Sequence, residues 1–139
     1  VKLIGTVRSF RPVTRDLAER RVREIAAGVA QAMGARAEIE YKRGYPSTIN
    51  AEREAMFAAK VGESVFGKDN VFTDGERTMG GEDFSFMLQA KPGAYVFLGQ
   101  GGGPNNCFLH NPGYDFNDEV IPLGAGYLAA LVEESLPLK

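Results

Sequence analysis

The sequence predicts an α/β fold divided into two lobes. Residues 1–45 contain a strand-like, a helical and a second strand-like segment in that order, which predicts a helix packed on a small sheet. Further helices alternate with short apolar segments after residue 46. The turn-forming residues of GYPST, at 44–48, separate the two parts, and a single α/β domain is the alternative organisation.

The first lobe is predicted from its residue patterns. VKLIGTVRSF, at 1–10, is rich in β-branched and aromatic residues and predicts a strand that ends before a proline. Apolar residues at helical spacing follow, so we expect a long amphipathic helix with Thr14 as its N-cap and Gly34 as its stop. RAEIEYKRGYP, at 36–46, alternates apolar and charged side chains, which is typical of a half-buried strand.

The second lobe is predicted to alternate helices with short strands. We expect a helix at 51–67 capped by Asn50, a strand at 70–72, a short helix at 82–90, a strand at 93–99, a loop at 99–106 and a helix that starts at Asp118 and runs to 136. The segment GAYVFLG, at 93–99, is continuously apolar, which is typical of a strand buried on both faces.

Composition limits the classes of function. Sixteen basic and eighteen acidic residues give a net charge of -2 without a basic cluster, which disfavours nucleic-acid binding. The sequence has neither a membrane-spanning apolar run nor a signal-peptide pattern. The one cysteine fits a reducing cytoplasm, where we expect the protein. Because the sequence opens at Val1 within a strand-like run, we also expect it to be part of a longer or processed chain.

His110 is the only histidine and the first candidate for chemistry. It lies in CFLHNPGYDFND, between an apolar stretch and turn-forming residues, which would place it at the carboxyl end of a sheet where α/β folds gather their sites. Imidazole is a common ligand of zinc and similar ions, but a metal site needs three or four ligands. From the residues alone, an ordinary loop histidine remains the alternative.

Two glycine-containing segments give weaker candidates. In TMGGEDFSF, Gly80 and Gly81 let the backbone approach a ligand at a helix start, whereas a simple turn with Glu82 near the helix dipole is the alternative. GQGGG is not a phosphate-binding loop, because Pro104 follows it and no Lys-Ser or Lys-Thr pair does.

Three further polar side chains complete the candidates. Cys107 has no evident base to activate it, so we expect a buried and inert thiol. Arg8 and Asn50 are considered as ligand contacts, with surface and capping roles as the alternatives.

The order of the motifs carries a family resemblance. GTVRSF, YKRGYPSTIN, MGGEDFSFMLQAKPGAYVFLGQG and LHNPGYDFNDEVIPLGAGYLAALV together resemble the carboxyl-terminal part of the aminoacylase-like metallopeptidases, which include hippurate hydrolases and indole-acetyl-amino-acid hydrolases. The resemblance covers nearly the whole chain. It implies that residues 1–45 are the second part of a lid domain and residues 46–139 the final segment of a zinc-peptidase-like catalytic domain.

The resemblance also implies an activity. Such enzymes hydrolyse the amide bond of N-acyl amino acids with water activated by two divalent ions, which could be zinc, manganese, nickel or cobalt. His110 would bind one ion, whereas the general-base glutamate and the other ligands would lie upstream of this sequence. The resemblance makes Glu82, Gly80, Gly81, Asn50 and Arg8 candidates for substrate binding or for support of the site.

Two consequences follow for the chain itself. The resemblance implies a homodimer formed through the lid domain, and an isolated chain without amide hydrolase activity. The alternative is a separate binding or dimerisation module that performs no chemistry.

Overall fold

The computed structural model describes residues 1–101 and 107–136, so the predicted loop at 99–106 lies largely outside the described residues. The chain forms two contact units, of which unit 1 comprises residues 1–49 and 76–91 and unit 2 comprises residues 50–75 and 92–139. These units are defined by contacts alone, and the lid and catalytic assignment of residues 1–45 and 46–139 stays a prediction.

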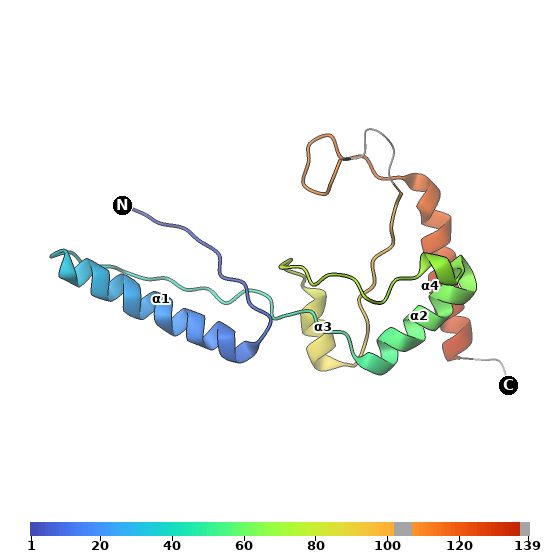
Figure 1. Cartoon of the computed structure of the whole chain (residues 1–139), viewed down its shortest axis with the longest axis horizontal. Coiled ribbons are helices and arrows are strands. Elements are labelled where there is room, and N and C mark those ends of the chain that lie inside the picture. The colour runs from blue at the N-terminus through green and yellow to red at the C-terminus, as the bar shows by residue number, and fades with distance from the viewer. Residues whose placement is uncertain (102–106, 137–139) are drawn as a thin grey trace. The chain divides into compact units, whose positions relative to one another are not determined.

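Unit 1 is built around the long helix α1, Pro12–Ala32 (Figure 1). Proline at the first helical position suits the helix start, where its missing N–H costs no hydrogen bond. Thr14 was expected as the N-cap, but this is wrong, because Arg11 occupies that position without a side-chain cap. Gly34 is confirmed at the stop, where its φ of 67° is the left-handed conformation that glycine adopts without steric cost.

Basic side chains of unit 1 join α1 to the extended segment at 36–45. Arg43 pairs with Asp16 at 2.7 Å and with Glu19 at 2.6 Å, and Glu19 also pairs with Arg23 at 2.9 Å. Hydrogen bonds from Arg43 and Arg23 lower the pKa of the Glu19 carboxyl below its usual value. Arg23 also donates to a backbone carbonyl of the extended segment at 3.1 Å.

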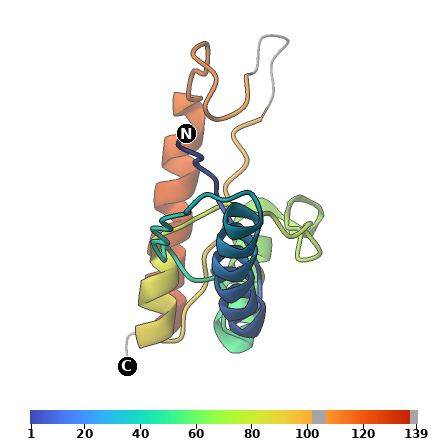
Figure 2. The same ribbon diagram turned by 90° about the vertical axis from the view of Figure 1, so that its left-hand side faces the viewer.

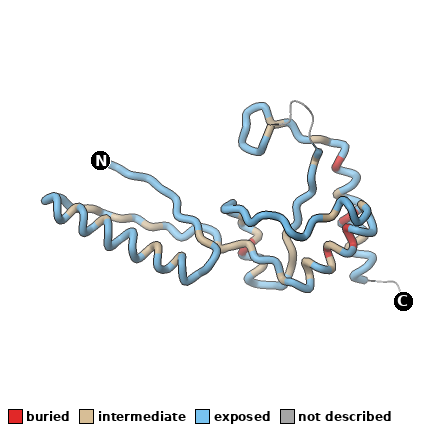
Figure 3. Tube along the Cα trace, viewed as in Figure 1, coloured by how far each residue is buried: buried red, intermediate tan, exposed pale blue. Residues whose placement is uncertain are grey.

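The two predicted strands of the first lobe are extended but unpaired. Residues 1–9 and 35–50 carry no strand assignment, and α1 has no buried residue (Figure 3). A strand exists only where its backbone N–H and C=O groups pair with a neighbour, and the described residues supply no such ladder. The α/β expectation is therefore not confirmed, since the regular structure of the described residues is helical.

Unit 2 packs helix α2, Glu52–Phe66, against helix α4, Ile121–Ser135, which is seen along its length in Figure 2. A short 3-10 helix, η1, Lys68–Asn70, follows α2. A second one, η2, Asp118–Val120, leads into α4. None of the helices among the described residues is long and apolar enough to cross a membrane.

The small core of unit 2 joins α2 to α4. Its buried apolar residues are Ala58, Val61, Val120 and Tyr127. The Tyr127 hydroxyl donates to the Ala58 carbonyl at 2.8 Å, and its ring lies 5.5 Å from the ring of Phe66. Hydrophobic packing and one buried hydrogen bond therefore connect these two helices.

Capping at the starts of α2 and α4 differs from the prediction. Ala51, not Asn50, is the N-cap of α2, because the Asn50 side chain binds the backbone of Tyr95 instead. Before α4, the Asn117 side chain accepts from the Glu119 N–H at 3.1 Å and so caps η2 one residue before the predicted Asp118, whereas α4 itself begins after Val120 without a side-chain cap.

The predicted apolar strands of the second lobe are not formed. Residues 93–99 carry no strand assignment, and Phe97 is 83% exposed, so burial on both faces is wrong for this structure. The predicted strand at 70–72 is replaced by the end of η1 and by an 81% exposed Phe72. The described residues provide no neighbouring strand for either segment, and the contact of 93–99 with α4 is one-sided, with Leu98 lying 3.2 Å from a Cβ added at Gly124.

Candidate functional site

His110 lies on an exposed loop in an uncommon backbone conformation. Its φ of 69° makes it the one non-glycine residue with positive φ in the described parts of the chain. A residue with a Cβ pays a steric cost in this region, and such residues persist where the surrounding structure fixes them, often at functional sites. The sequence singled out His110 for its chemistry, and the structure adds a conformational reason.

Hydrogen bonds from Asn111 shape the turn around His110. The Asn111 N–H donates to the Phe108 carbonyl at 3.2 Å, and the Asn111 carbonyl accepts from the Tyr114 N–H at 3.0 Å. The Asn111 side chain accepts from the Gly113 N–H at 2.8 Å, which is the local bond that favours asparagine in turns. The chain therefore forms two consecutive tight turns, at 108–111 and 111–114, and His110 lies in the first.

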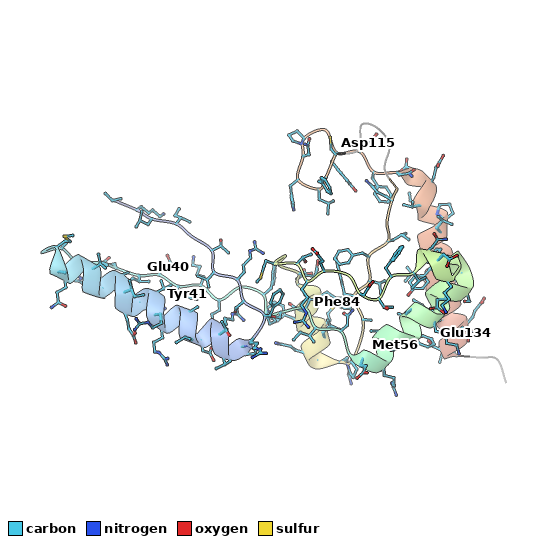
Figure 4. The ribbon with its side chains drawn as sticks, viewed as in Figure 1. Glu40, Tyr41, Met56, Phe84, Asp115 and Glu134 are labelled. Atoms are coloured by element: carbon cyan, nitrogen blue, oxygen red, sulfur yellow. The ribbon has the colours of Figure 1, made fainter. Side chains whose placement is uncertain are left out.

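Gln100 ties the far end of this loop to the segment at 93–99. Its side-chain oxygen accepts from the Tyr114 hydroxyl at 3.0 Å and from the Asn117 N–H at 3.3 Å. Its backbone carbonyl accepts from the Asn117 side chain at 2.9 Å. Figure 4 shows the labelled Asp115 on the part of the loop between these two partners. Sequence reasoning missed Gln100, because nothing local distinguishes this glutamine beside a glycine-rich run.

The residues described do not form a complete metal site. Within 1–101 and 107–136, no group of three or more His, Cys, Asp or Glu side chains is placed to hold an ion. His110 can fill one coordination position, because its imidazole is exposed and is a suitable ligand for zinc. Cys107 is half-buried, not fully buried as expected.

Arg8 and the two adjacent glycines come together in unit 1. The Arg8 guanidinium donates to the Met79 carbonyl at 2.6 Å. A Cβ added at Gly81 would lie 3.5 Å from that guanidinium and 3.4 Å from the Tyr45 ring, which is ordinary van der Waals contact, so Gly81 lies directly against both groups. At Gly80, which precedes this contact, an added Cβ would lie 3.6 Å from the Thr78 hydroxyl. The structure thus joins candidates that the sequence left separate.

Glu82 and Asn50 have structural partners. A Glu82 carboxylate oxygen accepts from the Phe84 N–H at 3.2 Å at the start of helix α3, Phe84–Ala90, and the Glu82 carbonyl accepts from the Ser85 hydroxyl at 2.6 Å. The Asn50 side-chain amide donates to the Tyr95 carbonyl at 2.9 Å and accepts from the Tyr95 N–H at 2.8 Å. A substrate contact by either residue stays a prediction.

The candidates thus fall into two groups. Arg8, Gly80, Gly81 and Glu82 lie in unit 1, whereas Asn50 and His110 lie in unit 2.

Comparison with known proteins identifies the family. The model of "Peptidase family M20/M25/M40" matches residues 4–134. The chain belongs to this family. The resemblance to the aminoacylase-like metallopeptidases is thereby confirmed. Family membership implies a peptidase-like fold, although the described residues show no paired strands.

Several curated members of the peptidase family are similar in sequence. The "Putative amidohydrolase YhaA" of Bacillus subtilis and the "Hippurate hydrolase" of Campylobacter jejuni are each 34% identical, and each match covers 91% of this chain and 32% of the relative. The "IAA-amino acid hydrolase ILR1-like 4" of Arabidopsis thaliana is 27% identical over 98% of this chain and 32% of its own length. The chain therefore spans about a third of the length of these relatives. No solved structure matches it.

Proposed function

We propose that these 139 residues belong to a metal-dependent amidohydrolase that cleaves the amide bond of N-acyl amino acids, with hippurate-like compounds as the substrate class. The observation that carries this proposal is the 34% identity to a hippurate hydrolase over 91% of the chain. The names of the other relatives, an amidohydrolase and an IAA-amino acid hydrolase, support the same bond type.

In this proposal His110 is one metal ligand. Its exposed imidazole and its fixed left-handed backbone suit a residue that must present a nitrogen in a set direction. Since the described residues hold no cluster of ligands, the other ligands and the general base would come from sequence outside these 139 residues. Two divalent ions per subunit would polarise the amide carbonyl and activate water. The 139 residues alone would be inactive.

Unit 1 supports a role in substrate binding and assembly. The contact between Arg8 and the backbone beside Gly81 places a cation next to an exposed glycine turn, where a substrate carboxylate could bind. The unburied apolar face of α1 favours pairing with a second copy, because exposed apolar surface promotes association. The proposal therefore includes a homodimer formed through residues 1–45.

The test is His110→Ala in the whole protein that contains these residues. We expect loss of nearly all hippurate hydrolysis and of bound metal, measured by elemental analysis, with an unchanged melting temperature in chelator. The chelator-treated parent should regain activity with zinc or manganese, and the variant should not. The control is Gln89→Ala, at an exposed position on α3. Normal turnover and metal content in His110→Ala would refute the assigned role.

A further inference from the structure

We propose that Gln100 is a positioning residue that fixes the conformation of the His110 loop, an inference that rests on the proposed role of His110. Gln100 is ten residues from His110 in sequence, and its hydrogen bonds go to Tyr114 and Asn117. It acts through the residues that close the loop, Tyr114 and Asn117.

Gln100 acts as a hydrogen-bond acceptor in all three of these bonds. Its side-chain oxygen receives two donors, one from a side chain and one from the backbone, and its carbonyl receives a third. Tyr114, Asn117 and Gln100 are all half-buried, so these bonds are partly protected from competition with water. Three bonds at one residue restrain the loop more than any single contact would.

Asn117 connects this restraint to α4. Its side-chain oxygen caps the N–H of Glu119 at 3.1 Å while its side-chain nitrogen donates to Gln100. The carboxyl end of the loop is therefore held between Gln100 and the start of the final helix. This arrangement uses both ends of one amide group, so Asn117 cannot shift without losing one of the two bonds.

Gln100 is itself anchored within unit 2. Five residues earlier, the backbone of Tyr95 is held by both ends of the Asn50 side chain, and the Gly93 carbonyl accepts from the Ala51 N–H at 2.9 Å. The extended segment leading to Gln100 is therefore attached to the start of α2. The His110 loop is therefore hydrogen-bonded to a segment that is itself held in place by α2.

The restraint matters because the His110 backbone is not in its preferred region. Left alone, a residue with a Cβ relaxes out of the left-handed conformation, and the imidazole would turn with the backbone. Asn111 closes the turn that contains His110 and opens the turn that ends at Tyr114, so these two consecutive turns pass the restraint at Tyr114 back toward His110. Gln100 thereby controls where the imidazole points without touching it.

The test compares variants of the whole protein. Gln100→Leu keeps the size of the side chain and removes its acceptor, whereas Gln100→Glu keeps an oxygen for both donors. Tyr114→Phe removes one bond and serves as the milder variant if Gln100→Leu does not fold. Gln89→Leu, at an exposed position of α3, is the matched control for replacing a glutamine by leucine.

Two readouts are measured on each variant. Hydrogen exchange of peptides that cover residues 107–117 reports the order of the loop, and kcat for hippurate hydrolysis reports the placement of His110. In Gln100→Leu we expect faster exchange confined to this loop and a fall in kcat of about 10- to 100-fold, the typical cost of losing a residue that orients a metal ligand. Tyr114→Phe should show a smaller effect of the same kind, and Gln100→Glu should recover most of both readouts.

The outcomes separate this inference from the proposed function. If His110→Ala abolishes turnover but Gln100→Leu and Tyr114→Phe match the control in both readouts, the positioning role is overturned and the proposed function stands. Faster exchange throughout unit 2 with no recovery in Gln100→Glu would show a general structural role and would also overturn it. If His110→Ala retains full turnover, the proposed function has failed together with the inference that rests on it.

Discussion

Replacing Tyr127 by phenylalanine measures how strongly one hydrogen bond joins α4 to α2. The change removes the hydroxyl that donates to the Ala58 carbonyl at 2.8 Å and leaves the ring against Phe66. A buried neutral hydrogen bond contributes about 0.5–1.5 kcal/mol net. Because Ala58 lies inside α2, its carbonyl keeps the bond expected within the helix, so we expect a loss of about 1 kcal/mol.

The comparison variant is Tyr127→Ala, which also removes the ring. Tyr127 is 8% exposed in a core of only a few buried residues, so loss of the ring should cost about 3–5 kcal/mol, as for other large aromatic truncations. Urea unfolding followed by circular dichroism gives both free energies. If the phenylalanine and alanine variants lose equal stability, or if the phenylalanine variant loses none, the account of this core is wrong.

Three other predictions concern stability. Burial raises the pKa of Tyr127, so as pH rises the unfolded chain loses the tyrosine proton before the folded chain does. The free energy of unfolding should therefore fall as pH rises above about 10, the ordinary pKa of tyrosine. In alkaline melting experiments, a Tyr127→Phe variant should lack this loss of stability. Gly62→Leu should destabilise by about 1–3 kcal/mol in urea unfolding, because an added Cβ would lie 3.3 Å from a Val71 methyl group. His110→Gly should melt no lower than the parent in chelator, with a gain of up to about 1 kcal/mol, since glycine adopts positive φ without the Cβ cost; a clear fall in melting temperature would contradict the backbone argument.

The helices were predictable because their information is local. The apolar spacing of residues 51–67 and 82–90 and the turn residues that flank them correctly gave α2 and α3. Gly34 marked the end of α1 for the same reason, since a glycine in the left-handed conformation follows from its own chemistry. Local pattern and observed structure agree where each residue acts on its neighbours.

The strands and caps depend on distant partners. Residues 93–99 have a strand-like composition, but pairing is a property of two segments, and one segment cannot specify it. Asn50 has the chemistry of a cap and binds Tyr95 instead, 45 residues away. A sequence pattern indicates what a side chain can bind, and the fold decides which partner is present.

The site was predictable in the same partial way. His110 was identified by its residue type and the turn residues after it. Gln100 was missed because its bonds span 14 and 17 residues. Its role depends on hydrogen bonds to residues that are distant in sequence, and only the structure shows those partners.

The interleaving of the two contact units has a consequence for how the polypeptide is made. The chain passes from unit 1 to unit 2 after residue 49, returns after 75 and leaves again after 91. During synthesis from the amino end, unit 1 cannot complete its contacts until residue 91 has left the ribosome, and by then the first half of unit 2 is waiting for its own partner. No single cut in the gene yields either unit intact, so a deletion study would have to splice two separate stretches to obtain one of them.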